Sequence, residues 1–208
     1  MPEQFVSDLP VADSTLVALK RCFQGRRGFE SLQHAKSATL WSAGIVLLFA
    51  AMLLSLIGSF GLKVFFPEFT SQLGILTMPM AWVFISMPLL LLVQIVGGKR
   101  GLEADRLFLT ASLSAFTFFL FFAAFLLTVP YLPEKPELAV LSVFFLLMGN
   151  AWATIQLHKG LVQLMNVSDA FAAIKAAGLS ALAFFVSVGV WLWLFKDAAT
   201  WDPTFFLG

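Results

Sequence analysis

The chain has little charge for its length. Only 12% of its 208 residues are Asp, Glu, Lys or Arg, about half the share of a typical soluble domain. The formal net charge of +1 provides no basic face, so we expect no nucleic-acid partner. Hydrophobic residues make up 60% of the chain and aromatic residues 15%, whereas disordered chains are poor in aromatics and rich in charge. The composition therefore excludes an ordinary soluble globule and a disordered chain.

Several kinds of site are also missing. Cys22 is the one cysteine, which excludes an intramolecular disulfide and a cysteine-based zinc site. The sequence has no Gly-x-Ser-x-Gly and no His-Glu-x-x-His motif, which are signatures of hydrolases and metalloproteases. No charged residue lies inside the long apolar runs described below, which argues against a proton-coupled pump. We therefore expect a protein that is not an enzyme and uses no cofactor or metal.

Long apolar runs are what the sequence has instead. A helix needs about 20 such residues to cross a bilayer, and five runs have that length. They are Thr39–Gly61, Gly74–Val96, Leu107–Val129, Leu138–Leu157 and Ala176–Phe195. None shows the alternating pattern of a membrane β-barrel strand. The sequence thus predicts an all-α fold, a polytopic membrane helical bundle with five transmembrane helices.

Positive charges are distributed unequally between the two ends of these runs. Ten Lys and Arg residues flank the runs on the side of the N-terminus, against three on the other side. Because positive residues concentrate on the cytoplasmic side, we expect a cytoplasmic N-terminus and an external C-terminus. The chain then divides into a cytoplasmic N-terminal arm (1–37), a five-span domain (38–196) and a short external tail (197–208).

The arm is predicted to contain one interfacial amphipathic helix over residues 13–25. Asp13 or Ser14 can cap its start and Gly25 can end it, while Leu16 and Phe23 fall on one apolar face. Basic side chains near the membrane surface attract anionic lipids. Four residues are expected to do this: Lys20, Arg21, Arg26 and Arg27. A regulatory or partner-binding arm is the alternative.

Two features leave other functions open. Pro79 and Pro88 lie inside the second run, and a proline near the middle of a helix predicts a kink. Since broken helices line substrate sites in transporters, a small-solute or lipid transporter or channel could be built around Pro88 and the polar Asn150. His158, at the end of the fourth run, is a weaker candidate for a haem or pigment ligand; an ordinary interfacial histidine is the simpler interpretation.

Small residues recur at intervals of four, as in membrane helices that pack closely. The rows are Gly149 with Ala153, and Ala173 with Ala177 and Ala181. Asn150 is expected to bond to another helix. The third run has seven phenylalanines around most of its circumference, so we expect some of them to face lipid or another subunit. These features favour a scaffold or accessory subunit of a larger membrane assembly, whose partners are the lipid bilayer and other subunits or a second copy.

Two stretches of sequence carry a family resemblance. They comprise Gly97–Gly101 leading into Leu107–Ser112, and Trp152 followed by Leu157–Leu161 and Asn166–Ala170. With the five closely spaced spans, they make the chain resemble the bacterial branch of the Yip family, first named as Ypt/Rab GTPase interactors. The Asp-Leu-Tyr-Gly-Pro signature of eukaryotic members is absent. The resemblance implies a non-enzymatic helical bundle in the bacterial cytoplasmic (inner) membrane, or in an endomembrane if the source is eukaryotic.

Overall fold

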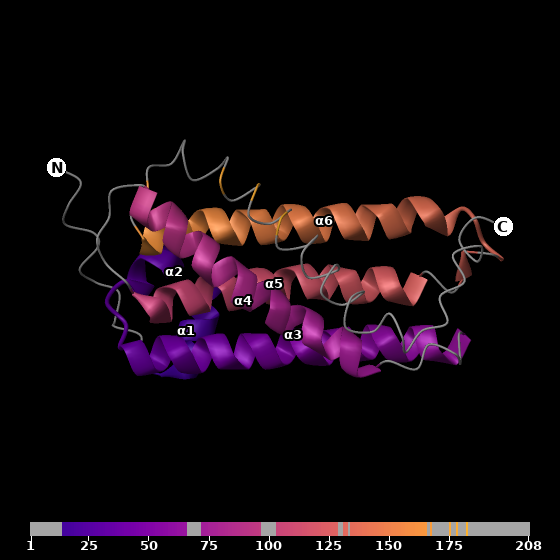
Figure 1. Cartoon of the computed structure of the whole chain (residues 1–208), viewed down its shortest axis with the longest axis horizontal. Helices are drawn as coiled ribbons and strands as arrows, with labels where there is room; N and C mark the ends of the chain where they lie inside the picture. The colour runs from indigo at the N-terminus through magenta and orange to yellow at the C-terminus, as the bar shows by residue number, and fades with distance from the viewer. Residues whose placement is uncertain are drawn as a thin grey trace.

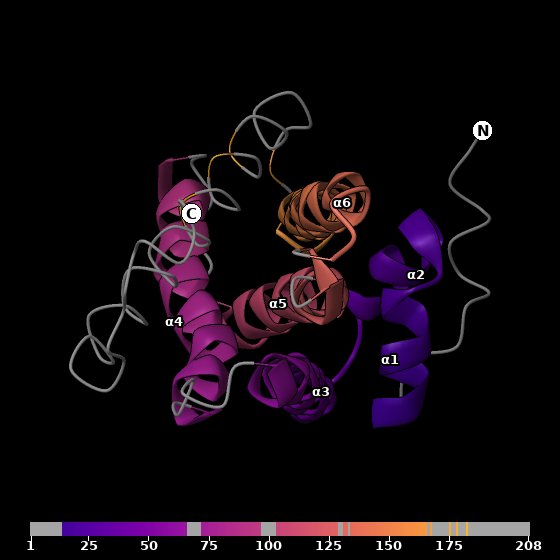
Figure 2. The same cartoon turned by 90° about the vertical axis from the view of Figure 1, so that its right-hand side faces the viewer.

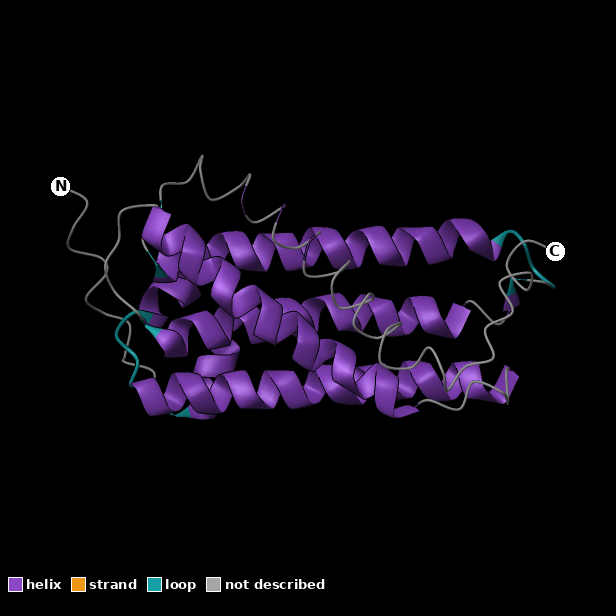
Figure 3. Ribbon diagram, in the orientation of Figure 1, coloured by secondary structure: helices purple, strands orange, loops and turns teal. Residues whose placement is uncertain are grey.

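The structure, a computed structural model, describes residues 14–65, 72–96, 103–128, 131–132, 134–165, 167, 175, 178 and 182. These residues form helices and turns and no β-strand (Figure 3). The α-helices and the closing π-helix are α1 (Thr15–Cys22), α2 (Gly25–Leu32), α3 (Ser37–Phe65), α4 (Gln72–Val96), α5 (Ala104–Thr128), α6 (Leu138–Lys159) and η3 (Gly160–Leu164). The all-α prediction is confirmed for this part of the chain.

Four of the described helices are long and apolar enough to cross a membrane. Their candidate spans are Ser37–Ser59, Met78–Ile95, Ala104–Thr128 and Leu138–Leu164. They correspond to the first four runs predicted from the sequence. The fifth run and the external tail (197–208) lie outside the described residues, except for Gly178 and Leu182.

Helix α5 is the centre of the bundle. Viewed along the bundle, α3 and α6 lie on opposite sides of α5, α4 lies on a third side, and the arm helices α1 and α2 lie on the fourth (Figure 2). Helices α3, α5 and α6 run side by side, whereas α4 crosses them diagonally (Figure 1). The buried share of each candidate span agrees with the central position of α5: it is 72% in α5, 44% in α4, 33% in α3 and 17% in α6.

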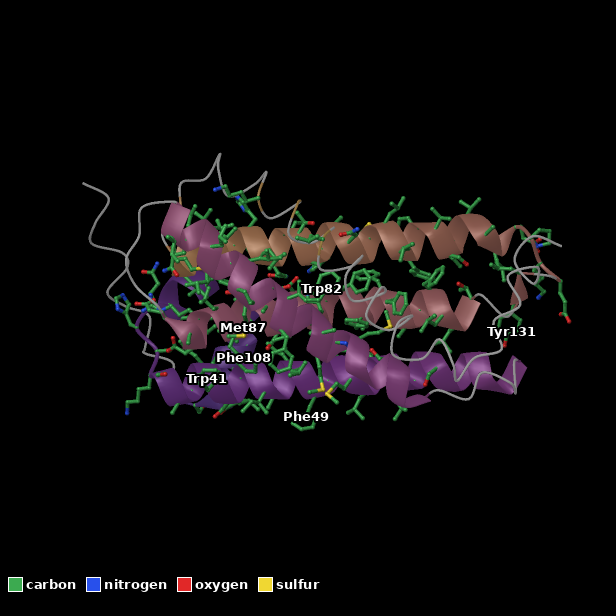
Figure 4. The ribbon with its side chains drawn as sticks, viewed as in Figure 1. Trp41, Phe49, Trp82, Met87, Phe108 and Tyr131 are labelled. Carbon is green, nitrogen blue, oxygen red and sulfur yellow. The ribbon has the colours of Figure 1, made fainter. Side chains whose placement is uncertain are left out.

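Successive spans run in opposite directions. Helices α3 and α5 begin at the end of the bundle where the arm lies, and α4 and α6 end there (Figure 1). The turn before α6, marked by Tyr131, lies at the opposite end (Figure 4). The structure therefore groups the connections as the charge distribution predicts. Which end faces the cytoplasm stays a prediction.

Aromatic rings fill the space around α5. Trp82 of α4 stacks on Phe118 with 4.6 Å between ring centroids, and Phe118 meets Phe119 edge to face at 5.1 Å. Near the arm, Trp41 of α3 stacks on Phe108 at 4.6 Å (Figure 4). Of the seven phenylalanines of α5, four are buried and three half-buried. The expectation that some of them face lipid or another subunit stays a prediction for the three half-buried rings, whereas neighbouring elements bury the other four.

Glycines bring α3 close to α5. A Cβ added at Gly44 would lie 2.6 Å from Phe108 Cδ1, and one at Gly58 would lie 2.8 Å from Leu126 Cδ1. Glycine inside a helix is less stable than alanine by about 0.5–1 kcal/mol. Packing therefore explains both glycines, because a side chain at either position would push α3 and α5 apart.

The arm contains two short helices. Ser14 caps α1, because its hydroxyl accepts a hydrogen bond from the backbone N–H three residues later at 3.4 Å. The predicted helix and its cap are confirmed, but its predicted end at Gly25 is wrong, since α1 ends at Cys22 and Gly25 begins a second helix, α2. Gly28 allows the two helices to meet, because a Cβ there would overlap the carbonyl oxygen of Arg21. This contact between elements was not visible as a pattern in the sequence.

Candidate functional site

A seam of hydroxyl groups and small side chains joins α5 to α6. At the end far from the arm, the Thr128 and Ser142 hydroxyl oxygens are 2.6 Å apart. Nearer the arm, Ser114 donates to the Ala153 carbonyl at 3.4 Å and accepts from the Trp82 indole N–H at 3.3 Å. Hydrogen bonds of this kind between membrane helices contribute about 1 kcal/mol each. The seam therefore fixes the register of α6 against the central helix.

The small residues predicted on α6 lie in this seam. A Cβ added at Gly149 would lie 3.0 Å from Phe121 Cβ, and Ala153 is fully buried. The Gly149 and Ala153 pair thus packs against α5 of the same chain. Asn150, the next residue, is half-buried. The second predicted row, Ala173, Ala177 and Ala181, lies outside the described residues.

The seam is tightest where α6 becomes the π-helix η3. A Cβ added at Gly160 would overlap Thr110 Cγ2 and lie 2.5 Å from the Thr110 hydroxyl oxygen. The Met165 N–H then donates to the Gly160 carbonyl at 3.1 Å, five residues back. Such π-helical turns are rare and are frequent at functional sites. Helix α6 and η3 together extend the fourth span to Leu164.

Arg106 connects three parts of the chain at this end of the bundle. Its Nη1 donates to the Leu164 carbonyl of η3 at 3.1 Å, and its Nη2 donates to the Gln33 carbonyl after α2 at 2.9 Å. Its guanidinium also pairs with Glu103, and its side chain is 20% exposed. The Gln33 side-chain amide donates to the Gln163 carbonyl. These five residues form what we term the arm junction.

Buried oxygen atoms without a hydrogen-bond partner occur close to the arm junction. Gln163 Oε1 belongs to the junction itself, while Thr110 Oγ1 and Gln156 Oε1 lie within one or two helical turns of it. The other such atoms in the described structure are Ser86 Oγ and Gln94 Oε1 on α4 and Ser112 Oγ on α5. A buried polar atom left unpaired costs about 1–3 kcal/mol. Hydrogen bonding in this corner of the bundle is therefore incomplete.

The inner face of the arm is apolar and closely packed. Ala18 and Cys22 of α1 and Phe29 and Leu32 of α2 are all fully buried. Burial raises the pKa of the Cys22 thiol from 9.0 to about 12. Because the thiolate is the reactive form of cysteine, the docked arm keeps this side chain unreactive.

The outer face of the arm carries the residues predicted to meet the membrane surface. Lys20 is exposed and Arg21 is half-buried. Leu16 is 77% exposed and Phe23 is 53% exposed, so large apolar side chains lie beside the positive ones. The side chains of Arg26 and Arg27 lie outside the described structure.

The remaining sequence candidates lie on α4 and at the end of α6. Helix α4 continues from Gln72 to Val96 through both prolines, with Pro79 buried and Pro88 exposed. The Pro88 ring thus lies on the outside of the described bundle. His158 is half-buried near the end of α6. Among the described residues, no group of three or more His, Cys, Asp or Glu side chains could hold a metal ion.

In the part of the chain that the structure describes, four helices are long and apolar enough to cross a membrane, and there is no strand. These features define the class of this protein as a helical, multi-span membrane protein. Comparisons of the chain with protein families, with curated proteins and with solved structures give no match. The resemblance to the Yip family therefore stays a prediction from the sequence.

Proposed function

We propose that this protein is a non-catalytic scaffold or accessory subunit of a membrane assembly. It would bind a membrane-spanning helix of another subunit, or of a second copy, on one side of α5. One observation carries the proposal. On α5, the most buried of the described spans, two large apolar residues are exposed: Leu120 at 45% and Leu127 at 43%. We term these two residues the α5 strip.

The α5 strip lies on the side of α5 that the arm also uses. At about 100° per residue, Leu120 and Leu127 lie within about 40° of Phe116 around the helix. Phe116 meets Phe23, the residue that follows α1, edge to face, with 5.9 Å between ring centroids. Among the described elements, the arm thus covers the first half of this side and none covers the second half. Helices α3 and α6 flank it (Figure 2), so the position suits one further helix.

The neighbouring helix α6 has an apolar surface of its own. It is the least buried of the candidate spans, at 17%, and its Trp152 is 43% exposed beside Phe121 of α5. Lipid tails are as apolar as leucine, so exposure alone does not attract a protein partner. A position between two helices does favour a protein partner, because a third helix makes close packing contacts with both of them. The charge-free apolar runs support the same interpretation.

Site-specific crosslinking tests the proposal. A photoreactive benzoyl-phenylalanine in place of Leu127 is expected to form a discrete protein adduct in the source membrane, and mass spectrometry would identify the partner. The matched control is the same substitution at Phe84, which is 67% exposed on α4 and should yield only lipid adducts. Only lipid adducts at Leu127 would contradict the proposal.

Native-size analysis after gentle extraction from the membrane provides an independent test of the proposed association. The wild-type chain should migrate with its partner in a defined stoichiometry. Leu127→Ala removes part of the proposed contact, so this variant should lose most of the associated protein, whereas Phe84→Ala should keep it. A wild-type chain that migrates alone would overturn the scaffold interpretation.

A further inference from the structure

We propose that the N-terminal arm (α1 and α2) is a displaceable cap on the bundle and that Arg106 is its latch. The docked arm covers the half of the α5 face next to the α5 strip. Release would uncover Phe116 and lengthen the apolar face that the strip begins. This last consequence rests on the proposed function; the docking equilibrium itself does not.

Arg106 acts on two helix ends at once. The last carbonyls of a helix have no partner within the helix and carry partial negative charge. The Gln33 carbonyl follows α2 and the Leu164 carbonyl ends η3, and the two guanidinium nitrogens of Arg106 bind one each. A single cation thus holds together two ends that would otherwise repel each other. Glu103 pairs with the same guanidinium, and this pairing helps to orient it.

A second polar contact joins the end of the arm to the bundle. The Gln33 side-chain amide donates to the Gln163 carbonyl of η3, beside the contact that Arg106 makes with the Gln33 carbonyl. The remaining contact is the apolar inner face, which includes Phe29 and Leu32. Breaking these two adjacent polar contacts would therefore loosen the end of the arm that follows α2.

The corner beneath the arm favours an opening equilibrium. The Gln163 amide oxygen, on the residue whose carbonyl accepts from the Gln33 amide, is buried without a partner when the arm is docked. Water would satisfy it after release, and this gain offsets part of the apolar contact that is lost. The released arm also has an amphipathic surface, with Leu16 and Phe23 exposed beside Lys20, and a bilayer interface accommodates such a surface.

Cys22 reports directly on the position of the arm. It is the only cysteine in the chain and is fully buried when the arm is docked, so a thiol reagent reacts only after release. In purified full-length protein, Arg106→Gln should accelerate maleimide labelling by about tenfold to a hundredfold, because hydrogen bonds from charged donors are the stronger ones. Lys159→Gln is the matched control: it removes a positive charge from the same end, outside the arm junction, and should label at the wild-type rate.

A second variant guards against a folding defect. Gln33→Ala removes the amide donor and leaves the Arg106 contacts to backbone carbonyls in place, so labelling should accelerate by less. Circular dichroism on each variant shows whether the bundle is intact. Wild-type labelling at the rate of a free thiol, or an intact Arg106→Gln variant that labels as slowly as wild type, would overturn the latch. No partner is present in this assay, so its outcome is separate from that of the crosslinking at Leu127.

Discussion

Individual residues determine how closely the helices of this bundle approach one another. The contact between Gly160 and Thr110 is the clearest case, because any side chain at position 160 would overlap Thr110 of α5. The sequence showed a glycine after the fourth span but not what it faces. Ser114 likewise connects α4 and α6 through Trp82 and Ala153. In each case the partner lies on another helix, more than 30 residues away.

The Gly160 contact predicts a destabilised variant. Gly160→Ala adds a methyl group that overlaps Thr110 Cγ2, and overpacking of this kind lowers the free energy of unfolding by about 1–3 kcal/mol. Thermal or denaturant unfolding in detergent measures the loss. Gly178→Ala is the control, because a Cβ there meets nothing within 4 Å. Adding Thr110→Ser removes the overlapping methyl and should restore part of the stability; no recovery would contradict the packing explanation.

Cys22 predicts a pH dependence of the docked arm. Its pKa is raised from 9.0 to about 12 by burial. Below pH 9.0 the thiol keeps its proton whether the arm is docked or released, so there is no effect. Between pH 9.0 and about 12 the released arm binds fewer protons than the docked arm, so docking weakens as pH rises.

Thermal unfolding across this pH range measures the effect. The melting temperature of the wild type should fall more steeply above pH 9.0 than that of Cys22→Ala, which has no titrating group at this position. Parallel slopes for the two proteins would show that the thiol does not sense docking.

At the scale of elements, the sequence predicted the spans better than the arm. Unbroken apolar runs placed four described helices to within a few residues, because length and hydropathy alone decide which segments can cross a bilayer. The second arm helix escaped prediction, since Gly25 resembles a helix stop and Gly28 is explained only by its contact with α1. Arg106 was counted solely as a flanking charge. Its main partners are backbone carbonyls, which no side-chain pattern reveals.

For the whole molecule, the hub position of α5 could not be derived from its composition. A helix that is apolar all round can face either lipid or protein, and the choice depends on how many neighbours surround it. Here α3, α4 and α6 take three sides, and the arm covers part of the fourth (Figure 2). The grouping of connections at the two ends was predictable, because positive charges follow the direction of each span.

The orientation is tested by labelling from each side of the membrane. In a Cys22→Ala background, a cysteine replacing Lys36 should react with a membrane-impermeant maleimide only from the cytoplasmic side. A cysteine replacing Lys135 should react only from the opposite side, because ten positive residues against three favour this orientation. Reaction of both positions from one side would refute the alternation of the spans.

The arm junction also sets an order of events during synthesis. Gln33 leaves the ribosome early, yet its side-chain partner on η3 lies 130 residues further along the chain. At about 5–20 residues per second, the arm waits on the order of 10 s for that partner. Docking can therefore begin only after the fourth span has been made. Until then Cys22 is open to reagents in the nascent chain. Its protection therefore marks the moment at which the arm docks on the four spans.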